Sequence, residues 1–176
     1  PENRIDVVYN TVAVPDSAAE AAQGAYMAFT GRISEEKGVD TILAAAAQLP
    51  DIPFRIGGVG PLYDTMKAAA PTNVVFAGML DPAGLSDFYR CARAVLVPSV
   101  WHETFGLVAA EAMANGIPVI ASRMGALPEL VKDGETGFLF EAGNPADLAE
   151  KIQRLWNDAA LAGRMGHAAY EHARRE

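Results

Sequence analysis

Short apolar runs alternate with longer amphipathic segments along almost the whole chain. In the clearest amphipathic segment, apolar residues recur on one helix face, at Val39, Ile42, Leu43, Ala46 and Leu49. The pattern predicts strands at 5–9, 26–30, 54–57, 74–77, 94–97, 119–121 and 138–140, and further helices at 61–70, 82–92, 105–114, 127–131, 145–156 and 159–174. Segment 15–24 is expected to form a loop or a short surface helix. Short strands that alternate with longer helices indicate a parallel sheet covered on both faces.

The predicted fold class is therefore α/β, a Rossmann-like doubly wound parallel sheet. In such sheets, ligands bind in the crevice beyond the carboxyl ends of the strands. Arg32, Gly58 and Glu103 each come shortly after a predicted strand. We expect these three residues to face one crevice.

Length and charge limit the partners of this chain. It has 176 residues, enough for one domain, with a formal net charge of -8, which argues against nucleic acid or an anionic membrane as a partner. No apolar run reaches about eighteen residues, so no transmembrane segment is predicted. We expect a cytoplasmic protein, with any peripheral membrane association made through a domain outside this chain. The single cysteine, Cys91, is predicted to be a buried, reduced thiol.

The predicted helix 105–114 begins at a sequence suited to binding an anion. Phe105, Gly106, Leu107 and Val108 stand at its start, and Gly106 has no side chain to keep a ligand from the free backbone N–H groups. Thr104 is the better candidate for its N-cap. Glu111 lies five residues past Gly106, roughly 7–8 Å along the helix axis, where a carboxylate suits a vicinal diol such as a ribose. A phosphate site at the helix start with a ribose site further along the helix predicts a nucleotide as the ligand.

An acidic chain that binds an anionic nucleotide needs a local positive patch. Arg32 and Lys37, bracketed by Gly31 and Gly38, are the candidates, although surface cations often only solvate a loop. Gly58 and Gly60 are equally compatible with a phosphate contact and with a plain turn. Glu103 could act in a turn, and Glu111 could be an exposed helix residue, but an unpaired carboxylate in an apolar run is costly.

Six segments resemble landmarks of the retaining family 4 glycosyltransferases, which use sugar nucleotides and have the GT-B architecture. The first is the pair Glu103 and Glu111, separated by seven residues around Phe105-Gly106-Leu107. The others are 31–38, 56–62, 75–78, 122–131 and 134–139, in the order of the family, so that the resemblance covers roughly residues 5–157. Two departures are Asn10-Thr11-Val12-Ala13 near the first strand and Gly125-Ala126 before Pro128-Glu129.

The resemblance implies a role for each candidate residue. Arg32 and Lys37, with Gly31, would bind the diphosphate, and Glu103 would face the donor sugar. The backbone at Met79 and Leu80 would contact the nucleobase. Retention in the family is ascribed to front-face attack, in which the leaving phosphate accepts the proton of the acceptor. The implied substrate is a nucleoside diphosphate sugar, with no cofactor and no metal.

The resemblance also implies that this chain is the C-terminal, donor-binding half of the enzyme. We expect a sugar-nucleotide-binding domain at 1–157 and a helical tail at 158–176. The chain begins at Pro1 without a methionine, so we interpret it as an excised piece whose partner is an N-terminal acceptor domain.

Two alternatives remain at this point. One is a nucleotide- or sugar-binding regulatory module without turnover. The other is a glycoside hydrolase that uses Glu103 and Glu111 as its carboxylate pair; Arg32, Lys37 and the glycine at the helix start argue against it.

Overall fold

The computed structural model describes residues 12–175, which fold around one parallel sheet of six strands. The strands are β1 (Tyr26–Thr30), β2 (Phe54–Gly57), β3 (Val74–Gly78), β4 (Ala92–Val97), β5 (Val119–Ser122) and β6 (Gly137–Phe140), in the order β3-β2-β1-β4-β5-β6. The predicted α/β doubly wound class is thus confirmed, and six of the predicted strands are present. The strand predicted at 5–9 lies outside the described residues.

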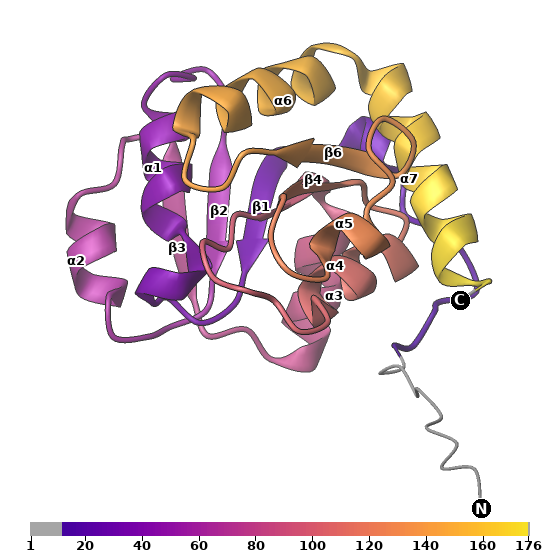
Figure 1. Ribbon diagram of the computed structural model, residues 1–176, viewed down its shortest axis with the longest axis horizontal. Coiled ribbons are helices and arrows are strands. Elements are labelled where there is room, and N and C mark those ends of the chain that lie inside the picture. The colour runs from indigo at the N-terminus through magenta and orange to yellow at the C-terminus, as the bar shows by residue number, and fades with distance from the viewer. Residues whose placement is uncertain (1–11, 176) are drawn as a thin grey trace, which may run out of the picture.

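Helices connect the strands, as predicted (Figure 1). They are α1 (Val39–Ala46), α2 (Tyr63–Ala68), α3 (Pro82–Arg90), α4 (Leu107–Ala114), α5 (Leu127–Leu130), α6 (Pro145–Asn157) and α7 (Ala159–Ala173), with short 3-10 turns η1 (Ala21–Gln23) and η2 (Glu35–Lys37). The turn η1 is the only helical part of segment 15–24, which agrees with the prediction of a loop or short helix.

Alternate residues of the strands belong to two hydrophobic clusters, one on each face of the sheet. Met27 and Phe29 of β1 join the cluster that contains α1 and α6, whereas Tyr26 and Ala28 join the cluster that contains α3 and α4. Side chains of a strand point alternately to opposite faces, so burial on both faces explains the apolar runs. This double core fixes where each strand ends and therefore where the loops of the site begin.

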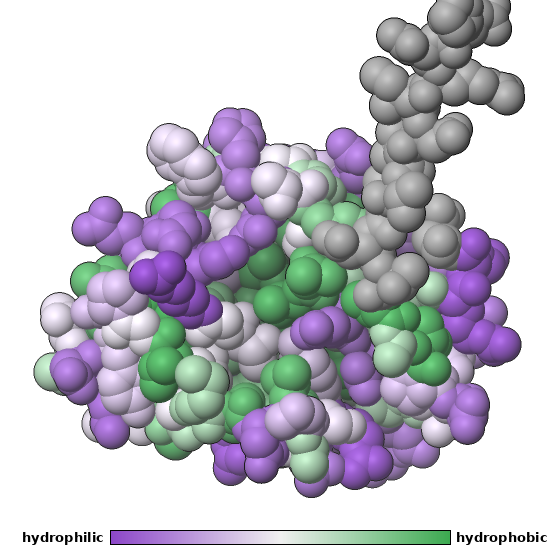
Figure 2. Space-filling model, turned by 90° about the horizontal axis from the view of Figure 1, so that it is seen from below, coloured by the Kyte–Doolittle hydropathy of each residue, from purple (hydrophilic) through white to green (hydrophobic). Residues whose placement is uncertain are grey.

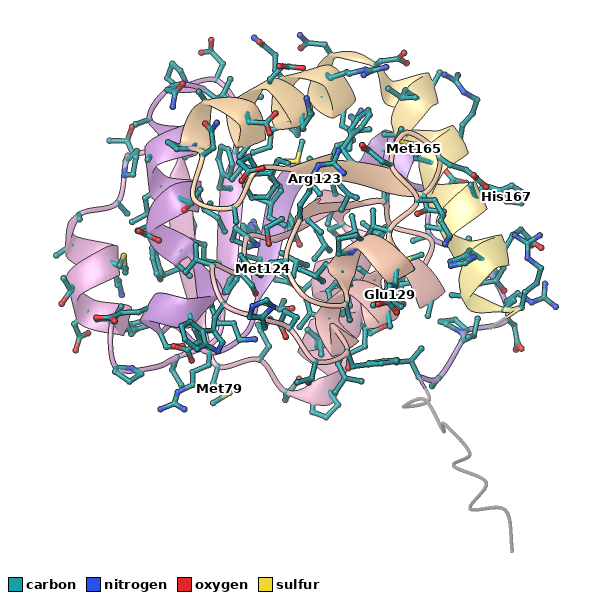
Figure 3. The ribbon with its side chains drawn as sticks, viewed as in Figure 1. Met79, Arg123, Met124, Glu129, Met165 and His167 are labelled. Carbon is teal, nitrogen blue, oxygen red and sulfur yellow. The ribbon has the colours of Figure 1, made fainter. Side chains whose placement is uncertain are left out.

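Helix α7 packs against the same domain. It contacts α4 and η1, and its residues Ala162 and Met165 belong to one core cluster while Ala169 belongs to the other. Figure 3 shows Met165 on the side toward the sheet and His167 pointing away from it. None of the helices in residues 12–175 has both the length and the apolar character that crossing a membrane requires.

Two local predictions were wrong. Cys91 is exposed, because α3 ends at Arg90 and Cys91 is its C-cap, so the amphipathic pattern stops before the thiol. The helix predicted from 105 begins at Leu107, and its N-cap is Gly106 rather than Thr104. Gly106 has a φ of 85°, in the left-handed region where a side chain would be strained, and this turn ends the loop.

The order of strands places the switch point of the sheet between β1 and β4, which pair in parallel. The chain leaves β1 in one direction along the sheet and β4 in the other, so their following loops part and leave a crevice between them. Strand β1 runs toward the lower edge of the molecule in Figure 1, and β4, which pairs with it in parallel, ends at the same edge of the sheet. Figure 2 looks onto this edge and shows apolar side chains among strongly hydrophilic ones.

Candidate functional site: a crevice at the switch point

A pocket of about 300 Å³ opens at this switch point. It is lined by the ends of β1 and β4, by the loops that follow them and by the first residues of α4: Phe29, Thr30, Gly31, Arg32, Lys37, Leu96, Val97, Ser99, Glu103, Thr104, Phe105, Gly106, Leu107 and Val108. Eight of the residues predicted for the site therefore meet in one pocket, namely Gly31, Arg32, Lys37, Glu103, Phe105, Gly106, Leu107 and Val108.

Lys37 and Glu103 form an ion pair across the pocket. The Lys37 Nζ donates to Glu103 Oε1, and the side chains are 32% and 18% exposed. Ser99 Oγ donates to the same carboxylate oxygen over 2.7 Å. Ser99 is itself tied to β5, since its carbonyl accepts a 2.6 Å hydrogen bond from Ser122 Oγ. The Glu103 carboxylate is thus held from two sides, and its orientation is set by the loop after β4 and by β5.

The backbone of Glu103 is anchored by the loop after β5. The amide of Ala126 donates to the Glu103 carbonyl over 2.9 Å. A Cβ placed on Gly125 would lie 2.3 Å from that carbonyl oxygen and 2.6 Å from the Glu103 amide nitrogen. Glycine is therefore required at 125 for this close approach. The Gly125-Ala126 pair, which departs from the two glycines of the resembling family, keeps the glycine at the position that contacts Glu103.

The amino terminus of α4 forms part of the pocket, which Gly106, Leu107 and Val108 line. Gly106 cannot cap the helix with a side chain, and the first backbone hydrogen bond of the helix runs from the Ala110 amide to the Gly106 carbonyl over 3.1 Å. The first N–H groups of a helix have no partner within it, and the helix dipole is positive at this end. With Arg32 and Lys37 opposite, this helix start favours an anion.

Arg32 is exposed at the mouth of the pocket and forms no ion pair with any residue between 12 and 175. Its position on the loop directly after β1 follows from Gly31, which has a φ of 149° at the turn out of the strand. The guanidinium is thus accessible to a ligand that enters the crevice.

Glu111 lies one turn further along α4 and is bound by a tyrosine. Tyr89 OH donates to Glu111 Oε2 over 3.1 Å, and Tyr89 OH and Thr30 Oγ1 are 2.9 Å apart. Tyr89 is buried in the last turn of α3, and this burial raises the pKa of its hydroxyl, a shift to which the charge of Glu111 adds. Glu111 is outside the residues that line the pocket.

The two glycines after β2, Gly58 and Gly60, pack closely against the backbone of the loop that carries Arg32. A Cβ on Gly58 would lie 1.9 Å from the Gly31 carbonyl oxygen, and one on Gly60 would lie 2.3 Å from that of Ile33. The Gly58 amide already donates to the Gly78 carbonyl over 2.6 Å. The observed contacts explain these glycines by close packing against the Arg32 loop, and the predicted phosphate contact stays a prediction.

Met79 and Leu80 follow β3 at the same edge of the sheet. Met79 is 73% exposed, and Figure 3 shows it at the lower edge of the molecule. Leu80 is partly buried and packs near Gly57. Neither lines the pocket, and a contact with a nucleobase remains a prediction for both.

A second hollow of about 340 Å³ is lined by residues of β6 and by Arg123, which lies far from Met79 in Figure 3. Its charged residues largely satisfy one another: Arg123 pairs with Asp133 at 2.7 Å, and Lys151 pairs with Asp147 at 3.1 Å. Because these charges are paired, the electrostatic attraction of this hollow for a charged ligand is weak. Among residues 12–175, no group of three His, Cys, Asp or Glu side chains is arranged to hold a metal ion.

The sequence analysis missed three residues near the candidate carboxylates: Ser99 donates to Glu103, Tyr89 donates to Glu111, and Thr30 is hydrogen-bonded to Tyr89. Ser99 lies two residues after the end of β4 and four before Glu103, so its place after a strand was an available signal. Thr30 ends β1 and could have been noticed as the polar residue that closes an apolar strand. Tyr89 is 22 residues from Glu111 in an unremarkable helix, and no local signal marks it.

The family model described as glycosyl transferases group 1 matches residues 14–172, which is nearly all of the described chain. This chain belongs to that family. Among curated relatives, the D-inositol 3-phosphate glycosyltransferase of Corynebacterium diphtheriae is 34% identical over 215 residues, which cover 98% of this chain and 50% of the relative. The chain thus spans about half the length of the curated relatives it matches.

Two solved structures place the fold among glycosyltransferases. HepE of Anabaena, in complex with UDP and glucose, is 26% identical with a TM-score of 0.79, and the match covers 88% of this chain and 45% of HepE. The C-terminal domain of the group 1 glycosyl transferase LpcC from Francisella tularensis is 27% identical with a TM-score of 0.76, covering 93% of this chain and 94% of that domain. This chain therefore corresponds to a C-terminal domain of the family.

Proposed function

We propose that this chain is the donor-binding half of a retaining glycosyltransferase, which transfers a sugar from a nucleoside diphosphate sugar to an acceptor hydroxyl. The observation that carries the proposal is the convergence of Arg32, Lys37, Glu103 and the open start of α4 on one pocket at the switch point. Membership of the family and the UDP and glucose in the structure of HepE support a sugar nucleotide as the ligand.

In this proposal, the diphosphate lies against the start of α4. Arg32 and Lys37 would bind its oxygens from the opposite side, and these groups together stabilise the charge that develops on the leaving diphosphate. Glu103 would accept hydrogen bonds from hydroxyls of the transferred sugar. Glu111 would accept from the ribose hydroxyls, one helical turn further from the phosphate.

Retention needs no base from this chain. The acceptor hydroxyl would attack from the face that the diphosphate leaves, and a phosphate oxygen would take its proton. Glu103 is occupied by Lys37 and Ser99, which suits a residue that orients the sugar. The acceptor would be held largely by an N-terminal domain.

The phosphate assignment is tested with the Arg32→Ala/Lys37→Ala double variant, titrated by calorimetry with UDP and with uridine. Two hydrogen bonds to charged groups are worth about 1.5–3 kcal/mol each, so UDP affinity should fall more than about 100-fold while uridine affinity changes little. A Lys132→Ala/Arg164→Ala variant removes the same charge from exposed positions outside the pocket and serves as the control. Equal losses for UDP and uridine would disprove the assignment.

A further inference from the structure

The hydroxyl of Tyr89 joins three elements behind the pocket. Tyr89 is 2% exposed, and its ring packs in the cluster between β1, β4 and α4. Its oxygen lies 2.9 Å from Thr30 Oγ1 at the end of β1 and 3.1 Å from Glu111 Oε2 on α4. One buried hydroxyl therefore connects the strand that leads to Arg32 with the helix that carries Glu111.

The chemistry of the three groups sets the direction of these hydrogen bonds. An ionised carboxylate only accepts, so the single proton of Tyr89 goes to Glu111. The Tyr89 oxygen is then left as an acceptor, and Thr30 must donate to it. The series of hydrogen bonds from Thr30 to Tyr89 to Glu111 thus directs both protons toward the carboxylate. A hydrogen bond to an ionised acceptor is stronger than one between neutral groups. Burial, which raises the pKa of Tyr89, keeps the proton in place.

This arrangement holds one oxygen of Glu111 and leaves the other available. Within residues 12–175, Tyr89 is the only side chain that donates to the Glu111 carboxylate. Oε2 is thereby fixed, and Oε1 can accept from a ligand. A glutamate on a helix has several rotamers, and fixing one of them before a ligand arrives removes part of the ordering cost of binding.

We propose that Tyr89 is the positioning residue for Glu111, which it holds in the orientation that accepts the ribose hydroxyls of the donor nucleotide. The inference rests on the proposed function of the pocket. It adds that the ribose contact depends on a residue that does not touch the ligand. Because Thr30 also lines the pocket, the same series of hydrogen bonds holds Glu111 at a defined place relative to the Arg32 loop.

A purely structural role would look different. A buried hydroxyl needs a hydrogen-bond partner, and Tyr89 could be bound to Glu111 only to satisfy this need. In that case, loss of the hydroxyl lowers stability and affects every ligand alike. A positioning role predicts a loss confined to ligands with ribose hydroxyls, and a loss that disappears when Glu111 is absent.

The test is calorimetry with the tightest-binding of UDP, GDP and ADP and with its 2′,3′-dideoxy form. Tyr89→Phe should weaken the ribonucleotide by about 3- to 10-fold, the equivalent of one hydrogen bond, and the dideoxy form by less than about twofold. In a Glu111→Ala background, Tyr89→Phe should have no further effect. Tyr26→Phe is the matched control, because Tyr26 is a buried tyrosine of the same cluster whose hydroxyl donates to the Phe88 carbonyl over 2.8 Å.

Thermal melting shows whether each variant folds, and Thr30→Val serves as a second variant that leaves Tyr89 intact. It should produce a smaller loss with the same preference for the ribonucleotide. Equal losses for ribonucleotide and dideoxynucleotide, or losses from Tyr89→Phe and Glu111→Ala that simply multiply, would overturn the inference and leave the proposed function standing. Failure of the unmodified chain to bind UDP, GDP or ADP would overturn both.

Discussion

Gly125 offers a sharp test of how Glu103 is positioned. Its φ is 58°, and a Cβ there would lie 2.3 Å from the carbonyl oxygen of Glu103. The atoms it would meet belong to the backbone, so they cannot turn away as a flexible side chain would. Gly125→Ala should therefore displace the segment that carries Glu103.

Alanine variants of two other glycines are controls that distinguish backbone strain from displacement of the Glu103 segment. Gly134 and Gly143 have φ values of 81° and 72°, and a Cβ on either would meet nothing within 4 Å. Alanine at these positions bears only the left-handed strain, about 1–2 kcal/mol. Gly125→Ala adds the loss of the hydrogen bond from Ala126 to Glu103, about 0.5–1.5 kcal/mol. The total should be about 1.5–3.5 kcal/mol, or roughly 3–14 °C in Tm for a domain of this size.

The assay combines urea denaturation of the three variants with titration of UDP and UDP-glucose. Gly125→Ala should be less stable than Gly143→Ala by the value of the lost hydrogen bond. It should also weaken UDP-glucose more than UDP, because the proposed role of Glu103 is to orient the sugar. The reasoning is refuted if the three variants are equally stable and the ratio of UDP to UDP-glucose affinity is unchanged in each.

Three further predictions concern metal, turnover and pH. EDTA should leave nucleotide binding unchanged, because Arg32, Lys37 and the start of α4 supply the positive charge; rescue of a lost signal by Mg²⁺ or Mn²⁺ would contradict this. The chain alone should bind donor yet transfer negligible labelled sugar, since positioning of an acceptor is worth about 7–11 kcal/mol of barrier, and transfer should appear when an N-terminal domain is joined to it. The pKa of Tyr89 is raised above its ordinary value of 10.0 in the folded chain. The contribution of the neutral Tyr89 hydroxyl to stability is therefore complete below pH 10 and is lost as the pH rises above that value. Tyr89→Phe should therefore flatten the alkaline fall in unfolding free energy by up to about 1.4 kcal/mol per pH unit, as measured by denaturation at several pH values.

The sheet and its helices could be predicted because burial on both faces leaves a strong local pattern. Strand β1, for example, is five buried residues in a row, and α6 shows a regular apolar face. The errors occurred where one residue ends an element. Gly106 takes a left-handed conformation that ends the loop before α4, and the apolar residue Phe105 before it gave no sign of this.

The convergence of the candidate residues on one pocket could be predicted from the sequence, whereas the hydrogen bonds that hold them in place could not. Arg32 and Lys37 lie in the segment after β1, and Glu103 lies in the loop after β4. The parallel sheet brings these two segments to one edge. The hydrogen bond between Tyr89 and Glu111 depends instead on how α3 and α4 pack on the same face of the sheet. Such contacts arise from tertiary structure, and no spacing in the chain encodes them.

The charge of the pocket shows why the net charge of the chain is a poor guide to its ligand. The chain carries -8, yet Arg32, Lys37, Glu103 and the start of α4 together amount to a local charge of about +1.5, if the helix end counts as about half a charge. At physiological ionic strength, charges further away than about 8 Å are largely screened, so the acidic remainder of the surface has little effect on an anion in the crevice. Lys37 is already paired with Glu103, so in the proposed function Arg32 and the helix start would be the groups that meet a diphosphate first. In the proposed function the ion pair would therefore have two roles: it would hold Glu103 in place before the sugar binds, and it would keep Lys37 beside the site of the departing phosphate.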